Sequence, residues 1–171
     1  YKFAMEASNG LLETIPEKLL RWESPPMADW LEGYVSMYIH PQIRFGRWNQ
    51  ILEEPFPEDQ TLYCSTTALL RYARTLALAV LGKIKDAEIE IEEFKNAARK
   101  VPESRTVFNN KVIDLLKIAM QMAEGELAYR KNDYEEAYKK LRYAVKLSDQ
   151  LPYDEPWGWM QPARHALGAL L

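Results

Sequence analysis

The stretch that decides the fold is residues 121–152, QMAEGELAYRKNDYEEAYKKLRYAVKLSDQLP. Two helical patterns are separated here by the turn-forming pair Asn132-Asp133, and the stretch ends at a proline. The first pattern carries a small residue, Gly125, which allows a second helix to approach closely. The second pattern carries an aromatic residue and then small or apolar residues at helical spacing, namely Tyr134, Ala137, Leu141 and Ala144. We expect Tyr134 and Ala137 to fill the crossing between the two helices.

This unit resembles a tetratricopeptide repeat, a helix–turn–helix motif of about 34 residues. The same residue order recurs along the chain, which strengthens the resemblance. The positions of Tyr134 and Ala137 correspond to Tyr1 and Ala4, to Trp48 and Ile51, and to Ile84 and Ala87. The pair Leu167-Gly168 matches the first helix of a further repeat. The phrases RFGRW (44–48) and LPYDEPWGWMQPARHALGALL (151–171) are also similar to uncharacterised tetratricopeptide proteins. That likeness covers about the whole chain and implies no activity.

The resemblance implies an all-α fold, a right-handed superhelix (α-solenoid) of antiparallel helix pairs. The 171 residues then form one helical array, with insertions because two repeat spacings exceed the standard length. We expect repeats at about 27–54, 60–100 and 106–150, with half repeats at 1–22 and 160–171. An array that starts and stops inside a repeat is interpreted as a fragment of a longer one. Alternatively, self-association of two chains covers the apolar faces at the two ends of the array. These faces carry Phe3, Leu11 and Leu12 at one end and Leu167, Leu170 and Leu171 at the other.

Periodicity and turn residues predict helices throughout and no strand. Pro41 lies inside a helical pattern and predicts a kink or break near His40. Left-handed turn conformations are expected at Gly46, Gly82 and Asn132-Asp133. The expected helices are Tyr1–Glu13, Pro16–Trp22, Met27–Phe45, Trp48–Leu52, Gln60–Leu81, Ile84–Lys100, Thr106–Arg130, Tyr134–Asp149 and Gln161–Leu171.

Composition and charge exclude several classes of protein. The chain has 22 Lys and Arg against 25 Asp and Glu, a net charge of −3, so no basic field favours nucleic acid. The apolar runs are shorter than the roughly 20 residues that span a bilayer, so we expect no membrane partner. The single Cys64 cannot form an internal disulfide and indicates a reducing compartment, so we expect an intracellular, cytoplasmic location.

The sequence contains none of the common catalytic motifs, so we predict no enzymatic activity, no cofactor and no metal. The only histidines, His40 and His165, are about three repeats apart, which predicts a separation of roughly 25 Å or more. Cys64 lies near a helix start, where the dipole can lower a thiol pKa, although a packed thiol is the favoured interpretation. Glu88 and Glu92 share one face of an acidic helix (residues 84–100), which we interpret as solvated.

The resemblance implies a groove lined by the first helix of each repeat. The corresponding residues mix aromatic, charged and apolar groups, as an extended peptide or partner helix requires. They are Ser36, His40, Arg44, Tyr72, Leu76, Met122, Glu126, Tyr129, Arg130, Gln161 and His165.

Trp157 and Trp159 stand in a loop, where they either brace the next repeat or form a contact surface. The Lys, Asn and Arg clamp for chaperone C-termini is absent, because its positions hold Ser36, His40, Leu69, Ala73, Ala119 and Ala123.

We therefore expect a non-catalytic scaffold that binds a protein or peptide partner in its groove. Two alternatives stay open. The groove residues could close into a small-molecule or enzymatic pocket, which would form one deep cavity. The chain could also be a structural spacer within a larger multidomain protein, in which case the groove would have no ligand.

Overall fold

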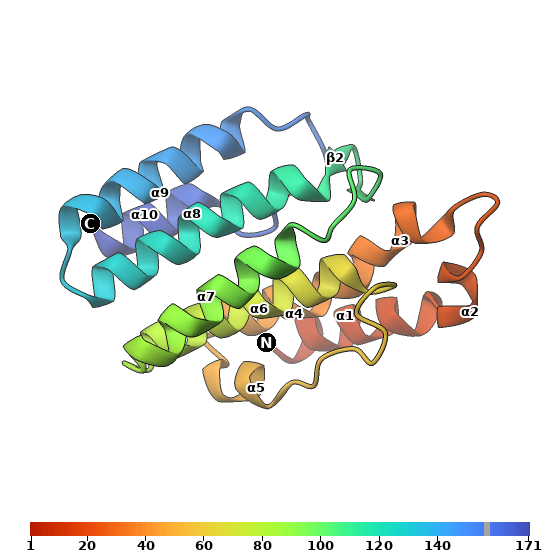
Figure 1. Ribbon diagram of the computed structural model, residues 1–171, viewed down its shortest axis with the longest axis horizontal. Coiled ribbons are helices and arrows are strands. Elements are labelled where there is room, and N and C mark those ends of the chain that lie inside the picture. The colour runs from red at the N-terminus through yellow and green to blue at the C-terminus, as the bar shows by residue number, and fades with distance from the viewer. Residues whose placement is uncertain (156–157) are drawn as a thin grey trace.

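The computed structural model describes residues 1–155 and 158–171, and it is mostly helical (Figure 1). The expectation of an all-α chain is confirmed at that level. In chain order the elements are α1 (Lys2–Thr14), α2 (Glu17–Leu20), α3 (Met27–Val35), the 3-10 helix η1 (Ser36–Tyr38), α4 (Ile39–Arg44), α5 (Trp48–Glu53), α6 (Cys64–Val80), α7 (Ile84–Ala98), β1 (Thr106–Val107), β2 (Asn110–Lys111), α8 (Val112–Arg130), α9 (Tyr134–Asp149) and α10 (Ala163–Leu170).

Two long helix pairs form the body of the protein. Helix α6 packs along α7, and α8 packs along α9, while α6 also contacts α8 and joins the two pairs (Figure 1). The tight turns between paired helices use left-handed residues at the predicted places, Gly82 with φ 75° and Asn132 with φ 62°. Gly46, after α4, has φ 63°. The three predicted turns are therefore confirmed.

The pairs are close because small residues stand at their crossings. A Cβ atom built on Gly125 of α8 would lie 2.8 Å from Leu141 Cγ of α9, too near for any other residue. The matched positions Ile51, Ala87 and Ala137 are all buried. The prediction for Tyr134 was wrong. Its side chain is 46% exposed and its ring lies against Tyr129 at 5.2 Å between centroids, outside the crossing.

The expected helix Met27–Phe45 is broken into α3, η1 and α4. This confirms the break predicted from Pro41, although the 3-10 turn begins at Ser36. Proline lacks an amide hydrogen and its ring crowds the carbonyl four residues earlier, at Met37, so the regular helix cannot continue through this turn.

The expectation of no strand was wrong at residues 106–111. Strands β1 and β2 form a short antiparallel hairpin, with Thr106 opposite Lys111 and Val107 opposite Asn110. Contacts with α3 hold the hairpin in place. Val107 meets α3 at Gly33, where a built Cβ would lie 2.3 Å from Val107 Cγ2. The hydroxyl of Tyr34 accepts from the backbone N–H of Phe108 at 3.3 Å. Such distant contacts override the local helical pattern.

Candidate functional site

Residues of six helices, α4, α5, α6, α8, α9 and α10, line a cavity of about 320 Å³, here called the groove cavity. Eight of the predicted groove residues line it together, although they come from α4, α6, α8 and the region of α10. These eight are Arg44, Tyr72, Leu76, Met122, Glu126, Arg130, Gln161 and His165. Apolar residues complete the wall, namely Ile43, Trp48, Val80, Leu141, Pro162, Ala166 and Ala169. The cavity is therefore apolar in its walls with a few polar groups.

The floor of the groove cavity is built on one face of α6. Tyr72 and Leu76 are four residues apart, so their side chains lie on the same helix face beside Met122 of α8. The Tyr72 hydroxyl donates to Oε1 of Gln161 at 3.1 Å. Burial, with the Glu126 carboxylate nearby, raises the pKa of Tyr72 well above its usual range, so this hydroxyl remains a donor.

Gln161 brings an unsatisfied polar group to this floor. The residue is 8% exposed, and its Nε2 has no hydrogen-bond partner within the described ranges 1–155 and 158–171. A buried amide donor without a partner costs about 1–3 kcal/mol. A ligand atom that accepts a hydrogen bond at this position would remove that cost.

The rim of the groove cavity is cationic on one side. Arg44 Nη1 lies 3.4 Å from His165 Nδ1, and across the described part of the chain Arg44 has no carboxylate within ion-pair distance. Arg130 is different, because its Nε and Nη2 both lie 2.8 Å from Oε1 of Glu126. Arg44 and His165 thus form the side of the rim that can bind an acceptor group.

Three predicted groove residues lie outside this cavity. Ser36 is buried and its hydroxyl donates to the Gly33 carbonyl at 2.6 Å. His40 is 6% exposed, and burial lowers its pKa to about 4. Tyr129 lies against Tyr134 and does not line the cavity. The resemblance to a repeat implied that these residues line the groove, but Ser36 and His40 are buried.

Trp159 is the residue that covers His40. Its ring meets His40 at 5.4 Å and Tyr72 at 5.7 Å between centroids, and its indole N–H donates to Met122 Sδ at 3.2 Å. The buried Trp159 confirms the bracing interpretation. Trp157, the other tryptophan of that prediction, lies outside the described residues. One end of the predicted groove is therefore filled by the chain's own side chain.

The hairpin positions this tryptophan. Asp154 accepts from Asn109 N at 2.8 Å and from Asn110 Nδ2 at 2.9 Å. A Cβ on Gly158 would lie 2.4 Å from Asn110 Nδ2, so the backbone passes directly over the hairpin. We call residues 151–155 and 158–162 the C-terminal segment. The sequence analysis did not predict that this segment binds the hairpin, because it expected residues 106–111 to be helical.

The predicted separation of the two histidines was wrong. Arg44 lies one helical turn after His40 on α4, which is about 6 Å along the axis. The Arg44 side chain reaches His165 at 3.4 Å. Trp159 contacts His40 of α4, Tyr72 of α6 and Met122 of α8, and His165 of α10 lies beside Arg44 of α4. Counting repeats along a regular array therefore overestimated the distance.

The other residues that the sequence offered as chemical candidates are Cys64 and the acidic residues of α7. Burial raises the pKa of Cys64, with Glu32 as a further cause, so the lowered thiol pKa that its position allowed is not found. Glu88 and Glu92 are exposed and pair with Lys131 and Lys95, as the solvated interpretation predicts. Glu90 of the same helix is buried. Within the ranges that the structure describes, no cluster of His, Cys, Asp or Glu is arranged to hold a metal ion.

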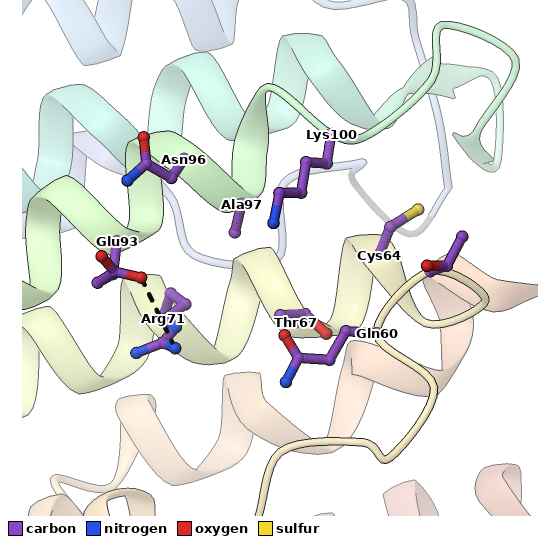
Figure 2. A pocket seen from close by; sticks show the side chains of 9 residues that line it. Gln60, Cys64, Thr67, Arg71, Glu93, Asn96, Ala97 and Lys100 are labelled. Atoms are coloured by element: carbon purple, nitrogen blue, oxygen red, sulfur yellow. Dashed lines mark ion pairs between the residues drawn. The ribbon is translucent and has the colours of Figure 1, made fainter.

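A second, polar pocket of about 310 Å³ lies between α6 and α7, and nothing in the sequence pointed to it (Figure 2). The two helices leave space here because the facing side chains Cys64, Thr67 and Ala97 are small. Figure 2 shows the Lys100 side chain reaching into this space from the end of α7. Arg71 approaches Glu93 at 4.0 Å and donates to Glu90 at 2.9 Å.

Comparison with known proteins does not extend this description. No protein-family model matches the chain, and no curated protein or solved structure is significantly similar to it. Among the described residues, no helix has both the length and the apolar character needed to cross a membrane.

Proposed function

We propose that the protein is a non-catalytic interaction module that binds a peptide segment of a partner protein in the groove cavity. One observation carries the proposal: eight residues selected from repeat positions in the sequence line a single cavity. They come from segments up to about 120 residues apart, so folding is needed to bring them together. Their chemistry combines an apolar floor with an unpaired amide donor at Gln161 and with the Arg44 guanidinium, which lies beside His165 at the rim.

The size of the groove cavity favours an extended peptide over a partner helix. A helix about 10 Å wide occupies about 420 Å³ for each turn. The cavity holds about 320 Å³, and Trp159 fills the neighbouring site over His40. An extended segment that inserts one or two apolar side chains fits this space. Its carbonyl or carboxylate oxygens can accept from Arg44 and Gln161.

The proposal includes the wider architecture and location that the resemblance implies. The packed pairs α6–α7 and α8–α9, with α10 against α9, support repeated helix pairs of a right-handed superhelix. The only cysteine, Cys64, is buried and unpaired, which supports a reducing intracellular compartment. A protein or peptide is accordingly the partner class that we propose.

A peptide-display selection against the purified chain tests this function. Affinities of selected peptides are then compared for three proteins: the parent, Ala169→Glu and Gly168→Glu. Ala169 is exposed and lines the cavity, so the new carboxylate blocks it. Gly168 is its neighbour on α10, is exposed and does not line the cavity. We expect Ala169→Glu to weaken binding at least about tenfold and Gly168→Glu to change it less than about twofold.

Other outcomes separate the rival functions. Peptides whose affinity is equal for both variants bind elsewhere and would contradict a groove-binding module. If no peptide is selected but small molecules bind in the cavity, the pocket alternative replaces the proposal, since 320 Å³ is within the size range of small-molecule sites. If neither binds, the spacer alternative is favoured.

A further inference from the structure

A cavity of about 740 Å³, larger than the groove cavity, lies on another side of the molecule. We call it the acidic cavity. Its lining residues come from α1, α2, the helices from α3 to α4, the segment 54–59 that follows α5, and the start of α6. Figure 1 labels these α-helices. Gln42 of α4 faces it, two residues and about 200° around the helix from His40. None of its lining residues belongs to the groove cavity.

Apolar side chains form much of its wall, including Met5, Leu12 and Val35. They belong to α1 and α3, two helices that contact each other only lightly compared with the long pairs. Phe56 closes the cavity on the side of α6, where the Arg71 guanidinium lies over its ring at 4.1 Å. A cavity volume of this size is within the range of small-molecule sites.

The charges around this cavity are unbalanced. Four carboxylates line it, those of Glu17, Glu54, Glu58 and Asp59, against the single guanidinium of Arg21. Arg21 is already occupied, because it pairs with Glu17 at 2.7 Å and with Asp59 at 3.0 Å. The arginines behind Phe56, Arg71 and Arg74, are held by Glu90.

Glu54 and Glu58 therefore remain without a cation anywhere in residues 1–155 and 158–171. Beside them, Gln42 is only 5% exposed and its Oε1 has no hydrogen-bond partner among those residues. Burial and the Glu54 carboxylate raise the pKa of Tyr38, whose hydroxyl is a hydrogen-bond donor beside Glu54 in this lining. The acceptors left without a donor from the described residues are Gln42 Oε1 and Glu58, and both Glu54 and Glu58 carry negative charge. The ligand that complements them supplies hydrogen-bond donors and positive charge.

We propose that the acidic cavity binds a small primary amine with an apolar chain. Its ammonium group donates to Glu54, Glu58 and Gln42, and its chain packs on Met5, Leu12 and Val35. An ammonium has three donors for these acceptors, whereas a quaternary ammonium has the charge but no donor. A carboxylate of the same length is repelled by Glu54 and Glu58. The site is separate from the groove cavity, so neither proposal depends on the other.

Titration of the purified chain with hexylammonium tests this site, with hexyltrimethylammonium, 1-hexanol and hexanoate as matched probes at constant ionic strength. Calorimetry gives the affinity, and the side-chain amide resonances of Gln42 report the location. We expect saturable one-site binding of hexylammonium, at least about tenfold tighter than that of each other probe. Equal binding of hexanoate, or no saturation by hexylammonium at about 10 mM, would overturn the proposal.

Variants then assign the site. Glu54→Gln combined with Glu58→Gln should weaken hexylammonium binding at least about tenfold, whereas Glu135→Gln, exposed on α9, should change it less than about twofold. Asn9→Lys is a second variant that leaves the carboxylates in place. Asn9 is exposed and lines the cavity, so the new ammonium occupies it and excludes the probe. Unchanged affinity in the carboxylate pair or in Asn9→Lys contradicts the assignment.

Discussion

Glu32 shows how a single buried carboxylate can organise two helices. It lies on α3 with 0% exposure, and its two oxygens accept from the backbone N–H groups of Ser65 and Thr66 at 3.2 and 2.8 Å. The Thr66 hydroxyl donates to it as well, at 2.8 Å. These N–H groups belong to the first turn of α6, which has no partners within its own helix. A distant side chain thus does what a local capping residue usually does.

Replacing Glu32 by Ala should destabilise the protein by about 2 kcal/mol, the upper range for loss of a helix cap, because buried N–H groups lose their acceptor. Urea unfolding of the variant measures this change. Glu13→Ala, an exposed change on α1, is the control and should stay within about 0.5 kcal/mol of the parent. Equal stability of Glu32→Ala and the parent would show that water satisfies the start of α6.

His40 predicts a specific dependence of stability on pH. Its pKa is lowered to about 4 by burial, from 6.5 in the unfolded chain. Between these values the unfolded chain binds a proton on this imidazole and the folded protein does not. The free energy of unfolding should therefore fall as the pH drops from 6.5 towards 4, by about 3 kcal/mol in total from this residue. Above pH 6.5 the contribution of His40 is constant.

The variant His40→Gln isolates this effect from the titration of carboxylates. Unfolding curves of parent and variant are compared between pH 7 and pH 4. The stability of the parent relative to the variant should decrease by about 3 kcal/mol over that range. Parallel pH profiles for the two proteins would mean that His40 is accessible to protons in the folded state.

At the scale of elements, the α8–α9 pair tests whether the close helix crossing is essential. Gly125→Ala should destabilise by about 1–3 kcal/mol, because the new methyl group meets Leu141 Cγ at 2.8 Å in a buried contact. Gly168→Ala on α10 should have the opposite sign, since nothing lies within 4 Å of its built Cβ. Helix propensity alone then stabilises by about 0.5–1 kcal/mol. Thermal unfolding of both variants measures the two signs, and stabilisation in both would contradict the close crossing.

The hairpin at residues 106–111 marks the limit of local prediction. Helix α8 itself begins only at Val112. Before it, Val112 N bonds to the Arg105 carbonyl at 2.9 Å and closes the hairpin loop. Arg105 is buried and reaches Asp29 at 3.5 Å and the Leu62 carbonyl at 3.2 Å. These partners are distant in sequence, so the helical periodicity of the segment could not reveal them.

For the molecule as a whole, Trp159 fixes where the C-terminal segment lies. Trp159→Ala should remove its contacts with His40, Tyr72 and Met122 and release α10 from the groove cavity. Hydrogen exchange of the amides in α10 should accelerate at least about tenfold, while α6 keeps its protection. Met160→Ala, at an exposed neighbouring position, is the control. Unchanged exchange in α10 would show that the Asp154 contacts hold the segment without the tryptophan.

The sequence by itself determined most helices, the Gly82 and Asn132 turns and the close pairing at Gly125. Each depends on residues near one another in the chain, where the spacing of apolar and small side chains specifies a helix face and its neighbour. Eight of the residues that line the groove cavity were predicted from the positions that the resemblance to a repeat implies.

Only the tertiary structure decided which distant segment covers each face. Trp159 covers His40, the hairpin holds Asp154, and Glu32 caps α6, although all three contacts join residues far apart in sequence. The acidic cavity likewise forms between segments separated by loops. Periodicity encodes that a face is apolar, but the free energy of burying it depends on whichever surface fits, and that fit exists only after the chain has folded.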